Sequence, residues 1–344
     1  MIRLHSLSAA TGCEVLAKCE FLNPGGSGKD RVALACVEAA EARGELGSGG
    51  LVVEGTSGST GISLALLARA RGYGCRIFMP NDQAAEKAAL LRRLGAEVEE
   101  VPPVSIVHEG HYVNRARRCA QEARAAGRPA LFVDQFDTPL NAAAHHATTG
   151  PEVWQQAQRT VDAFVMGAGT GGTLAGVGRY LKEASQGRTR VFLVDPPGSA
   201  LLRAVTAGVA WAPQQAERSQ RRHRDDTLVE GVGCDRVTGN FAAALPYVDG
   251  GWGVSDAEAV AMARRLLREE GLFLGSSSAL NCVGVLRAAQ AMGPGKTIVT
   301  ILCDSGARHM SRFWSDEHLA GRDAALAAAA AAGGERHSPE VATA

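Results

Sequence analysis

The sequence lacks the features that mark several large classes of protein. Its 344 residues contain 36 lysines and arginines and 36 aspartates and glutamates, so the formal net charge is zero. Without a basic excess a nucleic-acid partner is not expected, and no acidic tract indicates a charged interaction tail. No uncharged apolar run is long enough to cross a membrane, and the first residues lack the apolar core of a signal peptide.

Paired cysteines are also absent. The eight cysteines are scattered along the sequence and none forms a CxxC pair, which removes zinc ribbons and thioredoxin-like redox motifs. Several lie in apolar patterns, where cysteine behaves as a small hydrophobic residue. This usage indicates a reducing compartment, so we expect a cytoplasmic protein. A mitochondrial location is the alternative, because the short start of the chain carries Arg3 and no early acidic residue.

What the sequence does have is an alternation of strand and helix patterns. This alternation implies right-handed crossovers and mainly parallel sheets covered by helices. The predicted fold class is therefore α/β. We expect strands at 51–54, 75–80, 96–101, 130–136, 163–169, 190–196 and 297–303, and helices at 60–71, 84–95, 111–126, 173–184, 255–271 and 278–292.

The chain is long enough for two domains, which we expect to be three-layer α/β units. Residues 1–150 would form an N-terminal domain whose first 35 or so residues pack on the larger domain, residues 151–320. The low-complexity residues 321–344 predict a disordered tail, and the charged segment 214–226 predicts an exposed loop or helix face. Ligands in such folds bind in the crevice at the carboxyl ends of strands, so the loops there matter most.

A lysine ends the glycine-rich loop NPGGSGKDR at residues 23–31. The loop nearly fits the phosphate loop of nucleotide hydrolases. However, Asn23 replaces its first glycine and Asp30 replaces the hydroxyl that binds magnesium, so that alternative loses its mechanism. An exposed lysine in a turn is the other alternative, but a helix start is unfavourable for a cation. Lys29 would be more stable there as a neutral imine, which makes it a candidate for a covalent bond to a carbonyl cofactor.

A second loop, EGTSGSTG at residues 54–61, places hydroxyls and glycines between a predicted strand and a predicted helix. Hydroxyls and free backbone N–H groups at a helix start form an anion site. The alternative is a capped helix with Thr56, Ser57 or Ser59 as the N-cap. Because one cap needs one hydroxyl, four hydroxyls and three glycines indicate more than capping.

The third loop, GAGTGGT, fits two kinds of ligand. Gly167, Gly169 and Gly172 satisfy GxGxxG, and Asp195 ends the following strand, where a dinucleotide fold has its ribose-binding acid. Alone, this favours an NAD-dependent oxidoreductase. The same glycines can also hold a single phosphate. An NAD enzyme would have no use for the lysine loop.

A fourth loop, CDSG, places Ser305 after the last predicted strand, although a serine there often only caps a helix. The four loops together offer a lysine that can form a Schiff base, one anion loop for a cofactor phosphate and another for a substrate carboxylate. A cofactor with an aldehyde and a phosphate fits them. We therefore predict pyridoxal 5′-phosphate, which acts as an electron sink.

The sequence resembles the family of cysteine synthases and cystathionine β-synthases, which are fold-type II pyridoxal-phosphate enzymes of the tryptophan synthase β-like superfamily. The resemblance runs from Met1 to about Leu319 and is nearest to a divergent cysteine-synthase-like branch. It places the cofactor in the cleft between the two domains. It rests on the ordered motifs NPGGSGKDR, EGTSGSTGISLA, DQFDTPLNAAAHHATTGPEVW, GTGGTLAGVGRYLK, EGVG and ILCDSG.

The resemblance implies a role for each motif. Lys29 would form the Schiff base and take the substrate Cα proton, and Ser305 would hydrogen-bond the pyridine nitrogen. Ser59 stands where the family usually has an asparagine that contacts the 3′-oxygen of the cofactor. The residues that would bind the phosphate are Gly169, Thr170, Gly171, Gly172 and Thr173. Those that would bind the substrate are Thr56, Ser57, Gly58, Thr60 and Gln135.

The activity that the resemblance implies is the synthesis of cysteine and acetate from O-acetylserine and sulfide, through an aminoacrylate. Because of Ser59, two alternatives stay open. One is a related reaction on a serine derivative, which gives cystathionine or 2,3-diaminopropionate or dehydrates serine. The other is a pyridoxal-phosphate-binding paralogue with little activity. We expect a homodimer; the resemblance aligns Met1 with the family's TPL segment, which would leave out the arm that helps the dimer pack.

Two histidine pairs resemble metal ligands, but we expect no metal site. The sequence HEGH, which contains His108 and His111, is one residue short of HExxH, whose histidines must lie a helical turn apart. His145 and His146 are adjacent. We expect these histidines at the surface or beside the cofactor site.

Overall fold

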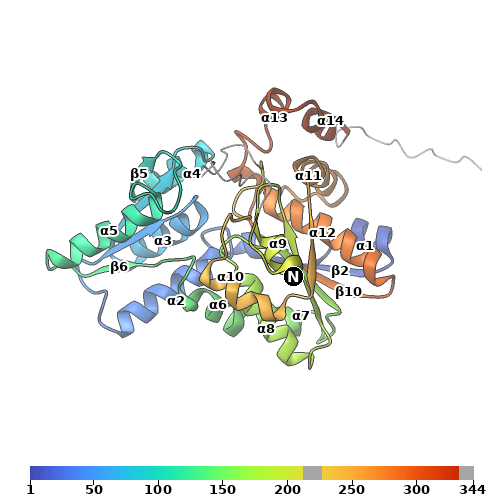
Figure 1. Ribbon diagram of the computed structural model, residues 1–344, viewed down its shortest axis with the longest axis horizontal. Helices are drawn as coiled ribbons and strands as arrows, with labels where there is room; N and C mark the ends of the chain where they lie inside the picture. The colour runs from blue at the N-terminus through green and yellow to red at the C-terminus, as the bar shows by residue number, and fades with distance from the viewer. Residues whose placement is uncertain (212–226, 333–344) are drawn as a thin grey trace, which may run out of the picture.

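The structure is a computed structural model that describes residues 1–211 and 227–332. The charged segment 214–226, for which we expected a loop or helix face, lies outside these residues. The strands form two sheets, one of four strands to the left in Figure 1 and one of six strands to the right. All strand pairs but one are parallel. The predicted α/β class with mainly parallel sheets is confirmed.

The smaller sheet has helices on both faces. Neighbouring residues of a strand point to opposite faces, so Val52 packs with Ile62 of one helix and Val53 packs with Ala116 of another. The strands, in the order β5-β4-β3-β6, are β3 (Leu51–Gly55), β4 (Gly74–Pro80), β5 (Glu97–Val101) and β6 (Ala130–Phe132). The helices are α2 (Lys29–Ala42), α3 (Ser59–Arg71), α4 (Ala85–Arg93) and α5 (Tyr112–Ala125).

The larger sheet repeats this arrangement. Phe164 packs with Leu174 of α8 on one face, and Val165 packs with Leu280 of α12 on the other. The strands, in the order β1-β2-β10-β7-β8-β9, are β1 (Ile2–Arg3), β2 (Glu14–Cys19), β7 (Ala163–Gly167), β8 (Arg190–Asp195), β9 (Gly250–Gly253) and β10 (Thr297–Leu302). The helices are α1 (His5–Thr11), α8 (Gly172–Ala184), α9 (Leu201–Ala207), α10 (Gly239–Ala244), α11 (Asp256–Glu270) and α12 (Ser276–Met292).

The chain moves between the two sheets twice. It starts in the larger sheet, where β2 pairs in parallel with β10, and then builds the smaller sheet from β3 to β6. It returns through α6 (Pro139–Ala144), a π-helical turn (His145–Thr149) and α7 (Gly150–Gln156) before β7. Short 3-10 helices occupy Glu20–Leu22, Leu245–Tyr247 and Gly306–Arg308.

The C-terminal segment is more ordered than its composition predicts. We expected disorder from residue 321, but α13 (Asp316–Arg322) and α14 (Ala324–Ala332) are helical, which corrects that prediction for residues 321–332. Alanine has the highest helix propensity, and Leu326 is buried against the apolar face of α11. Residues 333–344 lie outside the described part of the chain.

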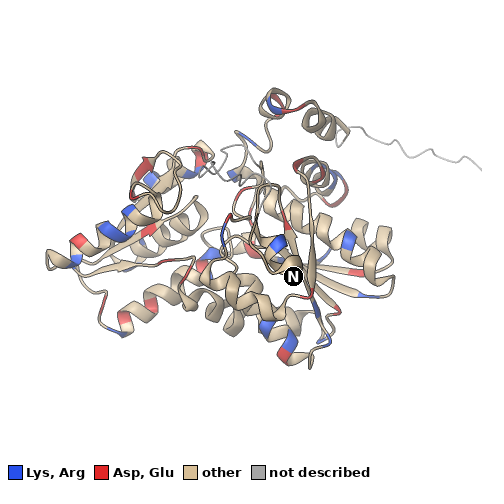
Figure 2. Ribbon diagram, viewed as in Figure 1, with Lys and Arg blue, Asp and Glu red and all other residues tan. Residues whose placement is uncertain are grey.

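Charged residues of both signs are spread along the ribbon in both halves of the molecule, as Figure 2 shows. Many of them form ion pairs between neighbouring elements, such as Lys182 of α8 with Asp249. None of the helices that the structure describes is long and apolar enough to cross a membrane.

Candidate active site

A cavity of about 500 Å³ lies where the two sheets face each other. Its walls are the loops that follow β3, β6, β7 and β10 and the loop that leads into α2. The carboxyl ends of strands from both sheets therefore meet at one site, as expected for α/β folds. The volume is in the range of cofactor and substrate pockets.

Lys29 is the first residue of α2, and its side chain lines the cavity. Among the residues that the structure describes, its ammonium has no hydrogen-bond or ion-pair partner. Asp30 turns the other way and accepts hydrogen bonds from Gly25 N–H and Ser63 Oγ, each at 2.5 Å. The aspartate that rules out a nucleotide-hydrolase loop thus ties the lysine loop to α3.

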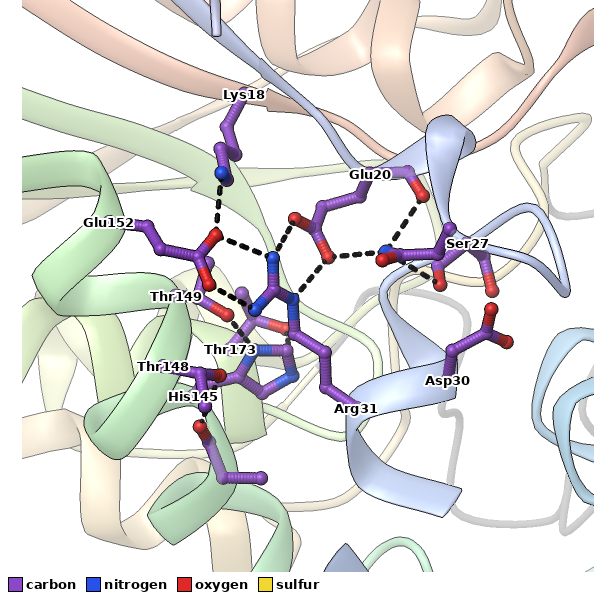
Figure 3. A network of polar contacts seen from close by, with 12 residues as sticks. Lys18, Glu20, Ser27, Asp30, Arg31, His145, Thr148, Thr149, Glu152 and Thr173 are labelled. Carbon is purple, nitrogen blue, oxygen red and sulfur yellow. Dashed lines mark hydrogen bonds and ion pairs between the residues drawn. The ribbon is translucent and has the colours of Figure 1, made fainter. Parts of the chain in front are cut away.

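Arg31 anchors the same loop on its other side (Figure 3). Its guanidinium contacts Glu20 at 2.8 Å and Glu152 of α7 at 2.8 Å, and Lys18 of β2 contacts Glu152 at 2.6 Å. Hydrogen bonds from Arg31 and Lys18 lower the pKa of Glu152 to about 2, although partial burial opposes them. The position of Lys29 is therefore set by an arginine with two carboxylate partners, one from each side of the loop.

The hydroxyl loop does not use its side chains to cap α3. The N-cap is Gly58, with a φ of 140°, and no side-chain oxygen accepts from the helix start. Thr56 accepts from Gly58 N–H at 3.1 Å, and Thr60 donates to Gln135 Oε1 at 2.5 Å. Gln135 in turn donates to Gly55 C=O at 3.0 Å, which joins the loops after β3 and β6. The capping alternative fails, and the first N–H groups of α3 face the cavity as an anion site.

The glycine loop after β7 packs so closely against neighbouring backbone that a side chain at either of two glycines would collide with it. A Cβ on Gly169 would lie 2.3 Å from Gly231 O, and one on Gly171 would lie 2.5 Å from Phe241 Cα. Gly171, with a φ of 88°, is the N-cap of α8, and no side chain caps that helix start. Thr173, in the first turn of α8, lies with its Oγ1 3.1 Å from His145 Nε2. This helix start offers backbone N–H groups and a hydroxyl to a phosphate.

Most of the residues predicted from the sequence meet at this cavity. Gly58, Gly172 and Ser305 do not line it; Ser305 instead accepts from Ala307 N–H at 3.3 Å, as the capping alternative predicts. The predicted residues that line the cavity are Lys29, Thr56, Ser57, Ser59, Thr60, Gln135, Gly169, Thr170, Gly171 and Thr173.

The cavity also contains residues that sequence reasoning missed. Cys303 lies two residues before Ser305, and burial raises the pKa of its thiol to about 11, so it is a neutral wall residue beside Ser277. The period of two along an extended strand could have indicated it. Lys87 and Glu230 also line the cavity, and no local pattern marks that pair.

The NAD alternative does not fit the geometry. Asp195 does not line the cavity, because it is buried at the end of β8 and accepts from Leu202 N–H of α9 at 2.8 Å. Burial raises its pKa to about 6. An acid that holds a helix start in the interior is not placed to bind a ribose.

The four histidines of the two pairs have separate roles. His108 accepts from Gly110 N–H, and His111 caps α5 by accepting from Val113 N–H. His146 pairs with Glu183 at 2.9 Å, and His145 contacts two threonines. Within residues 1–211 and 227–332, no group of three or more histidine, cysteine or acidic side chains could hold a metal ion.

Comparisons with known proteins give a consistent result. The model of the pyridoxal-phosphate dependent enzyme family matches residues 1–304. A protein named cysteine synthase 2 from Schizosaccharomyces pombe is 50% identical over 325 residues, which cover 93% of this chain and 82% of that protein. A Saccharomyces cerevisiae relative with mitochondrial cysteine synthase in its name is 44% identical, over 95% of this chain and 84% of its own.

A solved structure shows the same fold. The O-acetylserine dependent cystathionine β-synthase from Helicobacter pylori superposes with a TM-score of 0.73 at 30% identity, covering 88% of this chain and 90% of that chain.

Proposed function

Because the chain belongs to the family of pyridoxal-phosphate dependent enzymes, we propose that it is a cysteine synthase that converts O-acetylserine and sulfide to cysteine and acetate. One observation carries the proposal: the amine of Lys29, which has no partner among the described residues, and the starts of α3 and α8, whose N-caps are glycines, converge on one cavity. The 50% identical relative is itself named a cysteine synthase.

The residues around the cavity fit pyridoxal phosphate. When bound, the cofactor supplies an electron sink that lets a serine derivative lose its β-substituent and accept a nucleophile. The start of α8 would hold its phosphate, because its N–H groups carry partial positive charge and the glycines at 169 and 171 keep the backbone of this loop free of side chains. Lys29 would bind its aldehyde carbon.

The remaining residues bind and orient the substrate in this proposal. The start of α3, with Thr56, Ser57 and Thr60, would hold the substrate carboxylate beside Lys29, which would take and return the Cα proton. Gly58 belongs to this group through its N–H, which orients the Thr56 hydroxyl. Gln135 fixes Thr60 from the neighbouring loop.

Two further residues would contact the cofactor ring. Ser59 would replace the family's asparagine at the 3′-oxygen. Ser305 does not itself line the cavity but follows Asp304, which does, so it would reach the ring nitrogen only when the cofactor is bound; it accepts from Ala307 N–H, and its own O–H stays available to donate. A hydroxyl there cannot keep the nitrogen protonated as a carboxylate would, and this suits loss of a β-substituent.

The experiment is an assay of the purified protein, supplied with pyridoxal phosphate, for cysteine formed from O-acetylserine and sulfide. Wild type should form cysteine, and Lys29→Ala, folded to the same extent by circular dichroism, should form none. Cysteine formation by Lys29→Ala at the wild-type rate would contradict the proposal.

A larger nucleophile than sulfide is the second candidate. Residues 103–107 line the cavity, and all of them except Ser105 have apolar side chains that could pack against the stem of a larger nucleophile. A thiol amino acid such as homocysteine would give cystathionine, and the Helicobacter pylori neighbour is named for that reaction. Homocysteine, ammonia and sulfide compared in one assay would separate cystathionine, 2,3-diaminopropionate and cysteine synthesis.

We also propose a homodimer in a reducing compartment. All eight cysteines are free thiols in the structure, and the Saccharomyces cerevisiae relative carries mitochondrial in its name. The family resemblance supports the dimer. Light scattering during size-exclusion chromatography measures the oligomer, and cell fractionation separates the cytoplasm from mitochondria.

A further inference from the structure

A buried histidine connects the phosphate loop to a threonine outside the cavity. The π-helical turn His145–Thr149 places residues four apart on nearly the same side. His145 Nδ1 lies 2.9 Å from Thr149 Oγ1, and His145 Nε2 lies 3.1 Å from Thr173 Oγ1. Figure 3 shows the imidazole between the two hydroxyls. His145 and Thr173 line the cavity, whereas Thr149 does not.

Close packing of α8 against this turn makes the contact possible. A Cβ on Gly176 would lie 2.3 Å from Ala142 O and 2.7 Å from His145 Cβ, so only glycine lets the helix approach this far. Thr149 is fully buried, and among the described residues His145 is the hydrogen-bond partner of its hydroxyl.

The imidazole carries one ring proton. Burial lowers the pKa of His145 to about 3, and the charges of Lys29 and Arg31 act in the same direction. At neutral pH one ring nitrogen therefore donates and the other accepts. Both neighbours are hydroxyls, which can donate or accept, so the direction of these two hydrogen bonds depends on what else the hydroxyls contact.

A phosphate bound beside Thr173 can only accept hydrogen bonds, and this fixes the direction of the bonds that join Thr173, His145 and Thr149. When Thr173 donates its proton to a phosphate oxygen, its oxygen must accept from His145 Nε2–H. Nδ1 is then the acceptor, and Thr149 O–H must donate to it. The hydrogen bonds point one way, from Thr149 through His145 and Thr173 to the phosphate.

We propose that Thr149 and His145 are positioning residues that aim the Thr173 hydroxyl at the cofactor phosphate. The proposal rests on the proposed function, because it takes the phosphate to be that of pyridoxal phosphate. Without the Thr149 proton, His145 can adopt the other tautomer, with Nε2 accepting from Thr173. The Thr173 hydroxyl then turns away from the phosphate. Thr149 thus affects the cofactor without touching it.

The test is the affinity of the apo-protein for pyridoxal phosphate, measured by equilibrium titration. Thr149→Val and Thr173→Val should each weaken binding about tenfold, since each removes the charged hydrogen bond to the phosphate. The double variant should bind pyridoxal phosphate no more weakly than Thr173→Val alone, because the two substitutions remove the same hydrogen bond.

Two valine controls separate this effect from altered packing. Thr148 lies on the same turn, but its hydroxyl donates to Ala144 O at 2.7 Å. Thr189 is as buried as Thr149, and its hydroxyl donates to Val161 O at 2.8 Å, away from the cavity. Thr148→Val and Thr189→Val should bind the cofactor within about twofold of wild type.

If Thr149→Val folds poorly, two further comparisons still test the proposal: Thr149→Ser in the wild-type protein, and a Thr149 substitution in a His145→Gln variant. His145→Gln retains an amide donor for Thr173 and has no tautomer to select. Thr149→Ser retains the donor hydroxyl, and it should bind like wild type in the native background.

In the His145→Gln background, Thr149→Ala should leave the affinity for pyridoxal phosphate unchanged. If Thr149→Val binds as tightly as Thr189→Val, or if its effect multiplies with that of Thr173→Val, the positioning role is wrong. A wild-type protein that binds no pyridoxal phosphate would instead overturn the proposed function itself.

Discussion

Lys87 of α4 forms a buried ion pair with Glu230, and this pair joins the smaller-sheet half of the molecule to the larger-sheet half at the cavity wall. Burial alone would raise the pKa of Glu230, but Lys87 and neighbouring cations hold it below its usual value. Arg312 contacts the same carboxylate at 3.3 Å. The stem of Lys87 packs against Gly58, where a Cβ would lie 2.6 Å from it. One side chain therefore links both halves to the hydroxyl loop.

Lys87→Met should destabilise the protein by about 3 kcal/mol, because it leaves Glu230 buried with weaker partners. Chemical denaturation measures the loss. Adding Glu230→Gln should recover part of it, since the double variant no longer buries a carboxylate that has lost its lysine, although Arg312 also loses its contact with that carboxylate. Lys182→Met removes a more exposed pair with Asp249 and should cost less than about 1 kcal/mol. Equal losses for Lys87→Met and Lys182→Met would contradict a special role for the buried pair.

Glu54 should make stability depend on pH. It is fully buried in β3, and burial raises its pKa from 4.5 to about 8, with Asp134 adding to the shift. The folded protein then keeps a proton that the unfolded chain releases above pH 4.5. The contribution of this bound proton to the free energy of unfolding is complete below pH 4.5 and is lost as the pH rises to about 8.

Glu54→Gln should lack this slope, so its advantage over wild type should grow by roughly a few kcal/mol between those limits. Melting temperatures of both proteins from pH 5 to pH 8.5 measure the difference. Parallel curves would show that Glu54 ionises normally in the folded protein.

Ser59 is the departure from the family pattern that bears on activity. Its hydroxyl lines the cavity but reaches less far than an amide. Ser59→Asn should therefore raise the rate with O-acetylserine, and Ser59→Ala should lower it about tenfold by removing the contact. Steady-state kinetics at saturating pyridoxal phosphate measure both. If Ser59→Ala has the wild-type rate, Ser59 has no part in the reaction.

Gln135 should govern substrate binding and not cofactor binding. It holds Thr60 at 2.5 Å and Gly55 at 3.0 Å, and both contacts position the predicted carboxylate site. Gln135→Ala should raise KM for O-acetylserine about tenfold while the affinity for pyridoxal phosphate stays unchanged. A loss of affinity for pyridoxal phosphate without a change in KM would show that Gln135 supports the cofactor and not the substrate.

Local sequence patterns predict the loops of the site, but they do not predict the contacts of the residues that hold these loops in place. The lysine loop, the hydroxyl loop and the glycine loop each signal their chemistry within ten residues, because glycines and hydroxyls at a helix start have few other uses. Glu152, His145 and Glu230 lie in motifs that carry the family resemblance, but no local spacing predicts their contacts, which arise only through tertiary packing. Glu152 lies 121 residues along the sequence from its partner Arg31, His145 lies 28 residues from Thr173, and Glu230 lies 143 residues from Lys87.

Composition misled in one place for a physical reason. An alanine-rich segment with low complexity resembles a disordered tail, yet alanine also favours helix when an apolar surface is available. Leu326 supplies the buried contact that decides between the two outcomes for α14.

The most direct measurement is the absorption spectrum of the purified protein with pyridoxal phosphate, recorded before and after O-acetylserine and again after sulfide. We expect a visible band of lysine-bound cofactor that shifts with O-acetylserine, returns with sulfide and is missing in Lys29→Ala. A band of the same position and strength in Lys29→Ala, or no band in wild type, would contradict the assignment of Lys29 and of the cofactor.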